Sequence, residues 1–285
     1  LKDGSFLDLS AMEDWQPLAD SIYEVAQVEG IDFMTGGEDV VQMQTYRACY
    51  MESLLHGLNI PVEVDDSVHD TVRALTQPTD EKIVLPDGLT LRPYQQRGVQ
   101  WMQTLDRMHL GGVLADDMGL GKTVQVIALL LATREPGQTS LVVAPTTLTY
   151  NWLSELQRFA PGLSVMVLAG SAAQRQSQIR HVREVKDVDV LITSYPLIRR
   201  DIGQLSGISF RFAILDEAQY IKNAMSVGAG AVKQLKAQTR FALSGTPMEN
   251  HPGELWSIFD FVLPGYLLSF AQFMKRFGGG EEMEA

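Results

Sequence analysis

Two patterns of hydrophobic and polar positions divide the chain. In residues 1–80 apolar side chains recur at helical spacing, as in residues 15–25, which predicts a small, mainly helical segment. A stretch from 76 to 93 with three prolines follows. Beyond it, short apolar runs alternate with longer amphipathic ones, which predicts an α/β unit over residues 81–285.

This alternation indicates a mostly parallel sheet flanked by helices on both faces. The short apolar runs are the strand candidates, and the stretches between them are the helix candidates. In such sheets ligands bind at the carboxyl ends of the strands, so the loops there hold the candidate chemistry. We expect strands at 112–115, 141–144, 164–168, 188–193, 212–216 and 241–244, and helices at 92–107, 123–133, 148–159, 173–183, 196–201 and 227–236.

Composition limits the class of protein. The chain has 285 residues, 45% of them hydrophobic, which suits one large or two modest globular domains. No apolar run approaches a membrane span and no signal peptide is evident, so we expect no membrane partner. Because the chain begins at Leu1, we expect a fragment of a longer protein. Cys49 is the only cysteine, which excludes an internal disulfide and favours a reducing, intracellular setting.

The net charge of −12 is unevenly distributed. Residues 1–80 hold 3 Lys and Arg against 16 Asp and Glu, whereas residues 81–250 hold 18 against 14. The acidic segment could bind a protein partner or shield a basic surface. A solvated helical face explains the same charges more simply, and both interpretations stay open.

The most informative stretch is a phosphate-binding loop between a strand and a helix. In Leu114–Thr123 two glycines let backbone N–H groups converge at a helix N-terminus, where the helix dipole favours an anion. Asp116 stands where the strict loop pattern has glycine, and a surface turn is the alternative. The residues expected to bind nucleotide here are Asp117, Met118, Gly119, Leu120, Gly121, Lys122 and Thr123, with Lys122 on the phosphates and Thr123 on Mg²⁺.

A second buried run ends in two carboxylates, Asp216 and Glu217. At the end of a parallel strand Asp216 would lie beside the phosphate loop and hold Mg²⁺, mostly through water. Glu217 could polarise the water that attacks the nucleotide. The alternative is an ordinary loop with two acidic residues. The phosphate loop upstream in the sequence favours the metal-binding interpretation over this alternative.

Three further loops carry polar candidates. Arg92 and Gln95 open the helix before the phosphate loop, and the Gln95 amide matches the donor–acceptor edge of adenine unless it is merely exposed. Four hydroxyl residues follow strands and could bind nucleic-acid phosphates, although helix capping is the favoured reading of these residue types: Thr146, Thr147, Thr193 and Ser194. Ser244, Gly245 and Thr246 follow another strand and could sense the γ-phosphate.

Six ordered motifs together resemble the first motor lobe of superfamily-two helicase-like ATPases, and in particular the Swi/Snf-type DNA translocases, bacterial relatives among them. Ser-Gly-Thr-Pro before a Glu-Leu-Trp helix is especially typical of this group. The motifs are LRPYQ (91–95), LADDMGLGKT (114–123), VVAPTTLTYNW (142–152), ITSY (192–195), ILDEAQYIKN (214–223) and LSGTPMENHPGELWSIFDFV (243–262).

The resemblance implies a RecA-like P-loop lobe with ATP and Mg²⁺ as cofactors. It assigns catalysis to Lys122, Asp216, Glu217 and Gln219, and coupling of the nucleotide to a facing lobe to Gln219, which stands where many relatives have His. The implied partners are double-stranded DNA and a second RecA-like lobe that follows this one. The implied location is the cytoplasm, in association with the nucleoid, in a bacterium, or the nucleus in a eukaryote. Because that lobe supplies an arginine to the transition state, we expect weak ATP binding and little turnover from this chain alone.

Three other functions fit the motifs less well. An RNA helicase of the DEAD-box type usually has Ser-Ala-Thr where this chain has Ser-Gly-Thr. A restriction-type translocase remains possible on the motifs alone. A nucleotide-gated interaction module without catalysis would not need both Asp216 and Glu217.

Overall fold

The computed structural model describes residues 73, 90–249, 251–267 and 269–278. Apart from Arg73, which is helical and exposed, the predicted acidic segment lies outside these residues. In the described part of the chain, no helix combines the length and apolar character that a membrane crossing requires.

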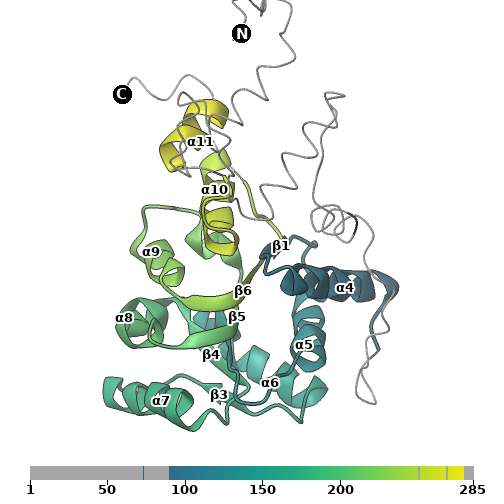
Figure 1. Cartoon of the computed structure of the whole chain (residues 1–285), viewed down its shortest axis with the longest axis vertical. Helices are drawn as coiled ribbons and strands as arrows, with labels where there is room; N and C mark the ends of the chain where they lie inside the picture. Colours follow the sequence, from purple (N-terminus) through teal and green to yellow (C-terminus); the bar gives the residue numbers. More distant parts are fainter. Residues whose placement is uncertain (1–72, 74–89, 250, 268, 279–285) are drawn as a thin grey trace, which may run out of the picture. The chain divides into compact units, whose positions relative to one another are not determined.

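A single six-stranded sheet organises the described residues, and every neighbouring pair of strands is parallel (Figure 1). Its order is β1-β6-β5-β2-β4-β3. The predicted α/β class with a parallel sheet is therefore confirmed. The strands are β1 (Gly112–Leu114), β2 (Ser140–Ala144), β3 (Val165–Val167), β4 (Val190–Ser194), β5 (Ser209–Asp216) and β6 (Lys236–Leu243).

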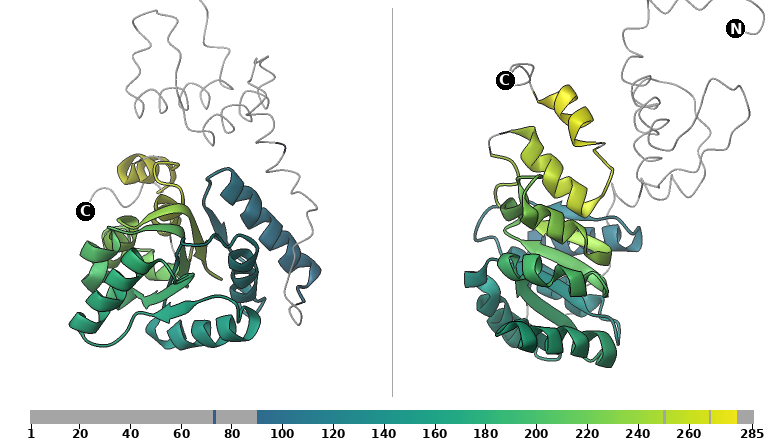
Figure 2. Two further views of the ribbon diagram at one scale, coloured as in Figure 1. Left: turned by 60° about the horizontal axis from the view of Figure 1, so that its bottom comes forward. Right: turned by 90° about the vertical axis from the view of Figure 1, so that its left-hand side faces the viewer.

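Helices cover both faces of the sheet. Figures 1 and 2 show α4, α5 and α6 on one face and α7, α8 and α9 on the other. The central strands are buried on both faces, which explains their nearly continuous apolar sequence. The helices are α4 (Pro93–Arg107), α5 (Lys122–Ala132), α6 (Thr149–Phe159), α7 (Ala172–Val185), α8 (Tyr195–Leu205), α9 (Val227–Lys233), α10 (Pro252–Val262) and α11 (Phe270–Phe277), with 3₁₀ turns η4 (Thr146–Leu148) and η5 (Ala218–Ile221).

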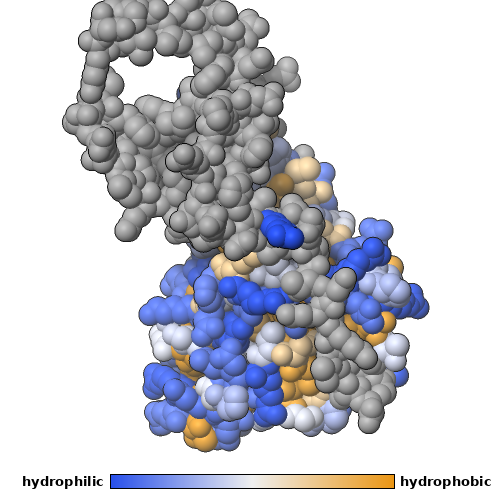
Figure 3. All heavy atoms as spheres, turned by 45° about the vertical axis from the view of Figure 1, so that its right-hand side comes forward, coloured by the Kyte–Doolittle hydropathy of each residue, from blue (hydrophilic) through white to orange (hydrophobic). Residues whose placement is uncertain are grey.

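The outer surface beside α4 is largely polar. Figure 3, in which the side of the lobe that carries α4 comes forward, shows hydrophilic side chains over most of the described surface, with smaller apolar patches between them. Arg92, Gln96, Arg97 and Arg107 of this region are exposed. The helix therefore places its apolar side against the sheet and its charged side in water.

The sequence-based prediction was wrong at β6. It expected a helix to residue 236 and a strand only from 241, whereas α9 ends at Lys233 and β6 begins at Lys236. The first half of β6 is polar, so its sequence lacks a strand signal. Pairing with β5 makes it a strand, and its buried Thr239 donates to Asp106 of α4 over 2.7 Å. The remaining predicted elements match observed ones with their ends displaced by a few residues, and α11 has no predicted counterpart.

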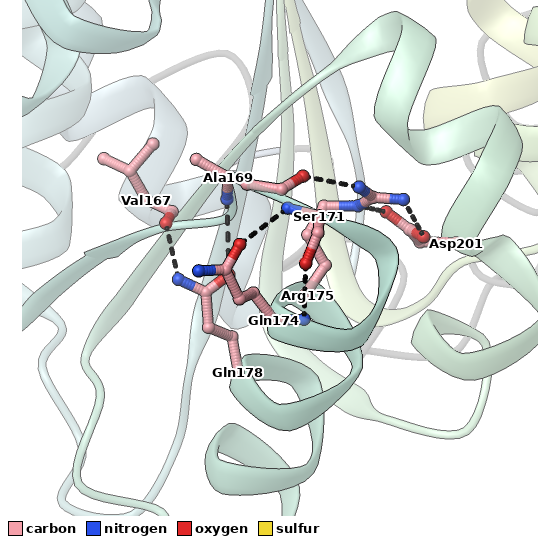
Figure 4. A network of polar contacts seen from close by, with 8 residues as sticks. Val167, Ala169, Ser171, Gln174, Arg175, Gln178 and Asp201 are labelled. Carbon is pink, nitrogen blue, oxygen red and sulfur yellow. Dashed lines mark hydrogen bonds and ion pairs between the residues drawn. The ribbon is translucent and has the colours of Figure 1, made fainter.

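The last strand of the sheet, β3, is protected by a side chain. Leu168 N donates to Ile192 O in β4, so the backbone groups of Val167 and Ala169 point away from β4. The Gln178 amide of α7 takes the place of a further strand there: Nε2 donates to Val167 O and Oε1 accepts from Ala169 N, each over 3.3 Å (Figure 4). The buried Arg175–Asp201 ion pair fixes the same helix, with Arg175 Nε 2.7 Å from Asp201 Oδ2.

Replacing Gln178 with leucine should therefore expose the edge of β3 and promote self-association, because an open strand edge invites pairing with another chain. Because two modest hydrogen bonds are lost, the free energy of unfolding should fall by about 1–2 kcal/mol. Light scattering and urea unfolding measure both effects. Gln176→Leu adds the same apolar side chain at an exposed position of α7 and is the control. Equal behaviour of the two variants would contradict the role assigned to Gln178.

Candidate nucleotide-binding site

Three adjacent strands bring the predicted site together. The sheet order places β1, β6 and β5 side by side, and all three run in the same direction. The phosphate loop follows β1, Ser244–Thr246 follow β6, and Glu217 follows β5. These segments, which are far apart in the sequence, therefore meet at one edge of the sheet.

The phosphate loop depends on two glycines. Gly119 and Gly121 have φ values of +82° and +79°, in the left-handed region that favours glycine. A Cβ on Gly121 would also lie 2.6 Å from Gln95 Nε2. The Lys122 ammonium group lies over the loop and donates to the carbonyl oxygens of Asp116 (2.7 Å) and Asp117 (3.2 Å). Its positive charge therefore lies at the loop that leads into the N-terminus of α5, where a phosphate group would bind.

Gln95 contacts the phosphate loop. Its Oε1 accepts from Arg92 N over 2.9 Å, and its Nε2 donates to Leu120 O over 3.0 Å. One amide hydrogen and one acceptor position stay available, which matches the number needed to pair with adenine. Arg92 is exposed at the start of α4, so it lies at the rim of the site.

The departure from the strict loop pattern at Asp116 has a structural reason. Asp116 Oδ2 accepts a 2.8 Å hydrogen bond from Nε2 of Gln125, a fully buried side chain of α5. Oε1 of Gln125 packs against Gly98 of α4, where an added Cβ would lie only 1.9 Å away. The Asp116 side chain thus fixes the first residue of the loop to both helices that flank it.

Gly98→Ala tests this arrangement. Alanine normally stabilises a helix interior relative to glycine by about 1 kcal/mol. Here we expect a loss of about 1–3 kcal/mol, because the new methyl group displaces the Gln125 amide, and weaker nucleotide binding follows from the released Asp116. Urea unfolding and nucleotide titration measure the two effects.

The matched control is Gly203→Ala in α8, where an added Cβ meets nothing within 4 Å. That variant should be more stable than the parent. The double variant Gly98→Ala, Gln125→Ala should recover part of the stability lost in Gly98→Ala. A Gly98→Ala protein as stable as the Gly203→Ala protein would show that Gln125 has room to move.

Asp216 is the buried carboxylate of the site, with 8% of its surface exposed. Oδ2 accepts from Trp152 Nε1 over 2.8 Å and Oδ1 from Glu217 N over 3.0 Å. Burial raises the pKa of Asp216, while the hydrogen bond from Trp152 and the charge of Lys122 act in the opposite direction. A cation at the nucleotide would favour the charged carboxylate further.

Glu217 starts a chain of hydrogen bonds across the three strand ends. Its Oε2 accepts from Gln219 Nε2 over 2.7 Å, and Gln219 Oε1 accepts from Ser244 Oγ over 2.9 Å. Ser244 Oγ in turn accepts from the backbone N–H of Thr246 over 3.1 Å. Gly245 lies against Met118 of the phosphate loop, where a Cβ would be 3.1 Å from Met118 Cγ. The predicted catalytic and coupling residues are therefore contiguous in space.

The four predicted nucleic-acid contacts fall into two pairs. Thr146 and Thr147 are exposed in η4. Thr193 and Ser194 are 0% and 3% exposed at the end of β4, so they are not surface groups. The expected capping was wrong: Ser194 occupies the N-cap position of α8, but its side chain makes no cap hydrogen bond, and α6 is preceded by Leu148.

Several site residues were missed by the sequence analysis. Trp152 and Tyr195 stood in quoted motifs without a role, yet Tyr195 donates its hydroxyl to Asp216 O over 2.8 Å. Glu155, one turn after Trp152, has a raised pKa because it is partly buried and near the charge of Asp216. A buried indole or phenol needs a polar partner, which is the signal that could have identified the two aromatic residues.

The donor groups suit Mg²⁺ bound with a nucleotide. Among the described residues, no three His, Cys, Asp or Glu side chains are grouped so that they could hold a metal ion by themselves. Mg²⁺ typically uses one or two carboxylates with substrate phosphates and water. Asp216, with Thr123 at the start of α5, matches that requirement.

Comparison with known proteins agrees with this geometry. Residues 94–283 match the model of the SNF2-related domain. The chain is 46% identical over 191 residues to the putative ATP-dependent helicase/translocase YwqA of Bacillus subtilis, a match that covers 66% of this chain and 20% of that protein. It is 37% identical over 225 residues to the TATA-binding protein-associated factor MOT1 of Saccharomyces cerevisiae, covering 73% and 12% of the two chains.

A solved structure is similar as well. The SWI2/SNF2 ATPase core of Sulfolobus solfataricus in complex with double-stranded DNA has a TM-score of 0.62 and 37% identity, covering 69% of this chain and 41% of that one. The chain thus spans about a fifth or less of these curated relatives and about two fifths of the solved chain. Its parallel sheet is that of a RecA-like ATPase lobe, and the chain belongs to the family of SNF2-related domains.

Proposed function

We propose that residues 81–285 form the ATP-binding first lobe of an ATP-driven motor that moves along double-stranded DNA. The convergence of three strand ends carries this proposal, because it places Lys122, Asp216 and the Glu217–Ser244 hydrogen-bond chain around one phosphate loop. A catalytic site of this kind needs a phosphate cradle, a carboxylate for the metal and a group that orients water.

Each residue has a defined task in this proposal. The loop N–H groups and Lys122 bind the β- and γ-phosphates, and Gln95 pairs with adenine. Thr123 and Asp216 would hold Mg²⁺, which would supply positive charge to the transferred phosphoryl group. Glu217 orients the attacking water. Gln219 connects Glu217 to Ser244 and Thr246 through the hydrogen bonds described above, so a change at Glu217 is passed to the loop after β6.

The DNA partner is supported by three observations. Thr146 and Thr147 expose hydroxyl groups at the carboxyl end of β2, on the same edge of the sheet as the nucleotide site. Residues 81–250 have a basic balance although the whole chain is acidic. The similar archaeal ATPase core was solved with double-stranded DNA.

We also propose that a second lobe completes the site in a longer protein. Here one wall of the site is open to solvent: Met118 and Leu120 of the phosphate loop are exposed. An arginine supplied from outside typically accelerates phosphoryl transfer by about 10³–10⁵-fold. The 285-residue chain should therefore bind ATP weakly and hydrolyse it slowly.

ATPase assays of the longer protein with different nucleic acids test the translocase proposal. We expect double-stranded DNA to stimulate turnover more than single-stranded DNA or RNA of equal length. Raising the salt concentration should weaken this stimulation, since phosphate contacts release counterions. Stimulation by RNA alone would instead identify an RNA helicase.

A further inference from the structure

Trp152 combines a structural and a polar role. It lies on the inner side of α6 together with Thr149 and Leu156, and 2% of its surface is exposed. The only polar atom of its side chain, Nε1, donates to Asp216 Oδ2 over 2.8 Å. The indole thus connects a helix that follows β2 with the carboxylate at the end of β5.

Asp216 is held at three points. The indole binds Oδ2, the Glu217 N–H binds Oδ1 over 3.0 Å, and the buried Tyr195 hydroxyl donates to the Asp216 carbonyl oxygen over 2.8 Å. An ionised carboxylate has about four acceptor positions. These contacts use one on each carboxylate oxygen, so each oxygen keeps one position for a further ligand.

We propose that Trp152 is a positioning residue for the metal–nucleotide complex: its indole N–H fixes the Asp216 carboxylate in the orientation that receives Mg²⁺. This inference rests on the proposed function of the site. Hydrogen-bond partners of metal-binding groups commonly set the orientation of those groups, and their loss lowers metal affinity by about 10–100-fold.

A purely structural role would be the simpler explanation, since a buried indole needs some acceptor. A buried carboxylate is, however, a costly acceptor, because its charge loses hydration. A neutral backbone carbonyl would satisfy the indole without that cost. The indole instead donates to Asp216, the carboxylate at the carboxyl end of β5. Metal binding by Asp216 explains this choice of partner better than the stability of α6 does.

Trp152→Phe keeps an aromatic ring and removes the donor. The affinity of the 285-residue chain for a non-hydrolysable ATP analogue is measured with Mg²⁺ and with EDTA. In EDTA, the affinity of Trp152→Phe for the analogue should stay within about twofold of the parent's affinity. The factor by which Mg²⁺ increases that affinity should be about tenfold or more smaller in the variant. Trp256→Phe, the same substitution in α10, is the control and should leave this factor unchanged.

An equal loss with and without Mg²⁺, or no loss, would overturn the inference. Failure of the parent chain to bind the analogue in a Lys122-dependent way would instead overturn the proposed function. If Trp152→Phe does not fold, the parent itself provides the test. The chain has four tryptophans, so its indole N–H resonances can be assigned from single Phe variants at the other three. The Trp152 resonance should shift with Mg²⁺ and analogue but not with analogue in EDTA; the absence of a Mg²⁺-specific shift would overturn the inference.

Discussion

Lys122→Ala is expected to weaken binding of Mg-ATP by about 10- to 100-fold, because a hydrogen bond to a charged group contributes about 1.5–3 kcal/mol. The Lys122 ammonium group lies over the phosphate loop and donates to the carbonyl oxygens of Asp116 and Asp117. A bound nucleotide would offer it phosphate oxygens instead, which pair more strongly with an ammonium group than neutral carbonyls do. Isothermal titration of the parent and the variant measures the difference.

Lys236→Ala is the matched control for this prediction. Lys236 is exposed and begins β6, so it lies at the amino end of a strand whose carboxyl end faces the site. Removing its charge changes the net charge of the chain by the same amount. Equal weakening by both variants would mean that Lys122 acts only through the overall field of the protein.

Glu217→Gln in the two-lobed protein is expected to lower turnover by about 10²–10⁴-fold and to leave ATP binding nearly unchanged. The side chain has the same shape but no longer accepts a proton or holds a negative charge. Glu217 has a φ of +52°, so its backbone is held in a conformation that non-glycine residues seldom adopt. This conformation directs the chain sharply from β5 into η5 and brings Glu217 to Gln219.

Single-turnover kinetics and titration with ATP separate the two effects. Glu184→Gln on the exposed side of α7 removes the same charge and should change neither quantity. A Glu217→Gln protein with normal turnover would favour the alternative in which the nucleotide only gates an interaction. Loss of ATP binding in this variant would show that Glu217 supports the fold of the site.

Much of the site could be predicted because its signals are local. Gly119, Gly121, Lys122 and Thr123 are consecutive or nearly so, and the loop, the strand before it and the helix after it each have their own sequence pattern. The same holds for Asp216 and Glu217 at the end of an apolar run. The meeting of the two motifs follows from the rule that parallel strands place their carboxyl ends at one edge.

The features that could not be predicted depend on contacts between distant residues. The polar half of β6 is a strand because β5 pairs with it and Asp106 accepts from Thr239. Gln125 reaches Asp116 only because Gly98 of another helix leaves room for its amide. Trp152 meets Asp216 across 64 residues of sequence. The sequence separation of these pairs follows no helical or strand periodicity, so the sequence pattern does not predict the contacts.

The measurement that tests the account most directly is steady-state ATP hydrolysis by the 285-residue chain and by the longer two-lobed protein, with and without double-stranded DNA. Lys122→Ala variants of both serve as blanks. We predict DNA-stimulated turnover by the two-lobed protein. The 285-residue chain should show little turnover above its blank, and DNA should not stimulate it. DNA-stimulated turnover by the 285-residue chain that disappears in Lys122→Ala would contradict the account, because one lobe would then complete its own catalytic site.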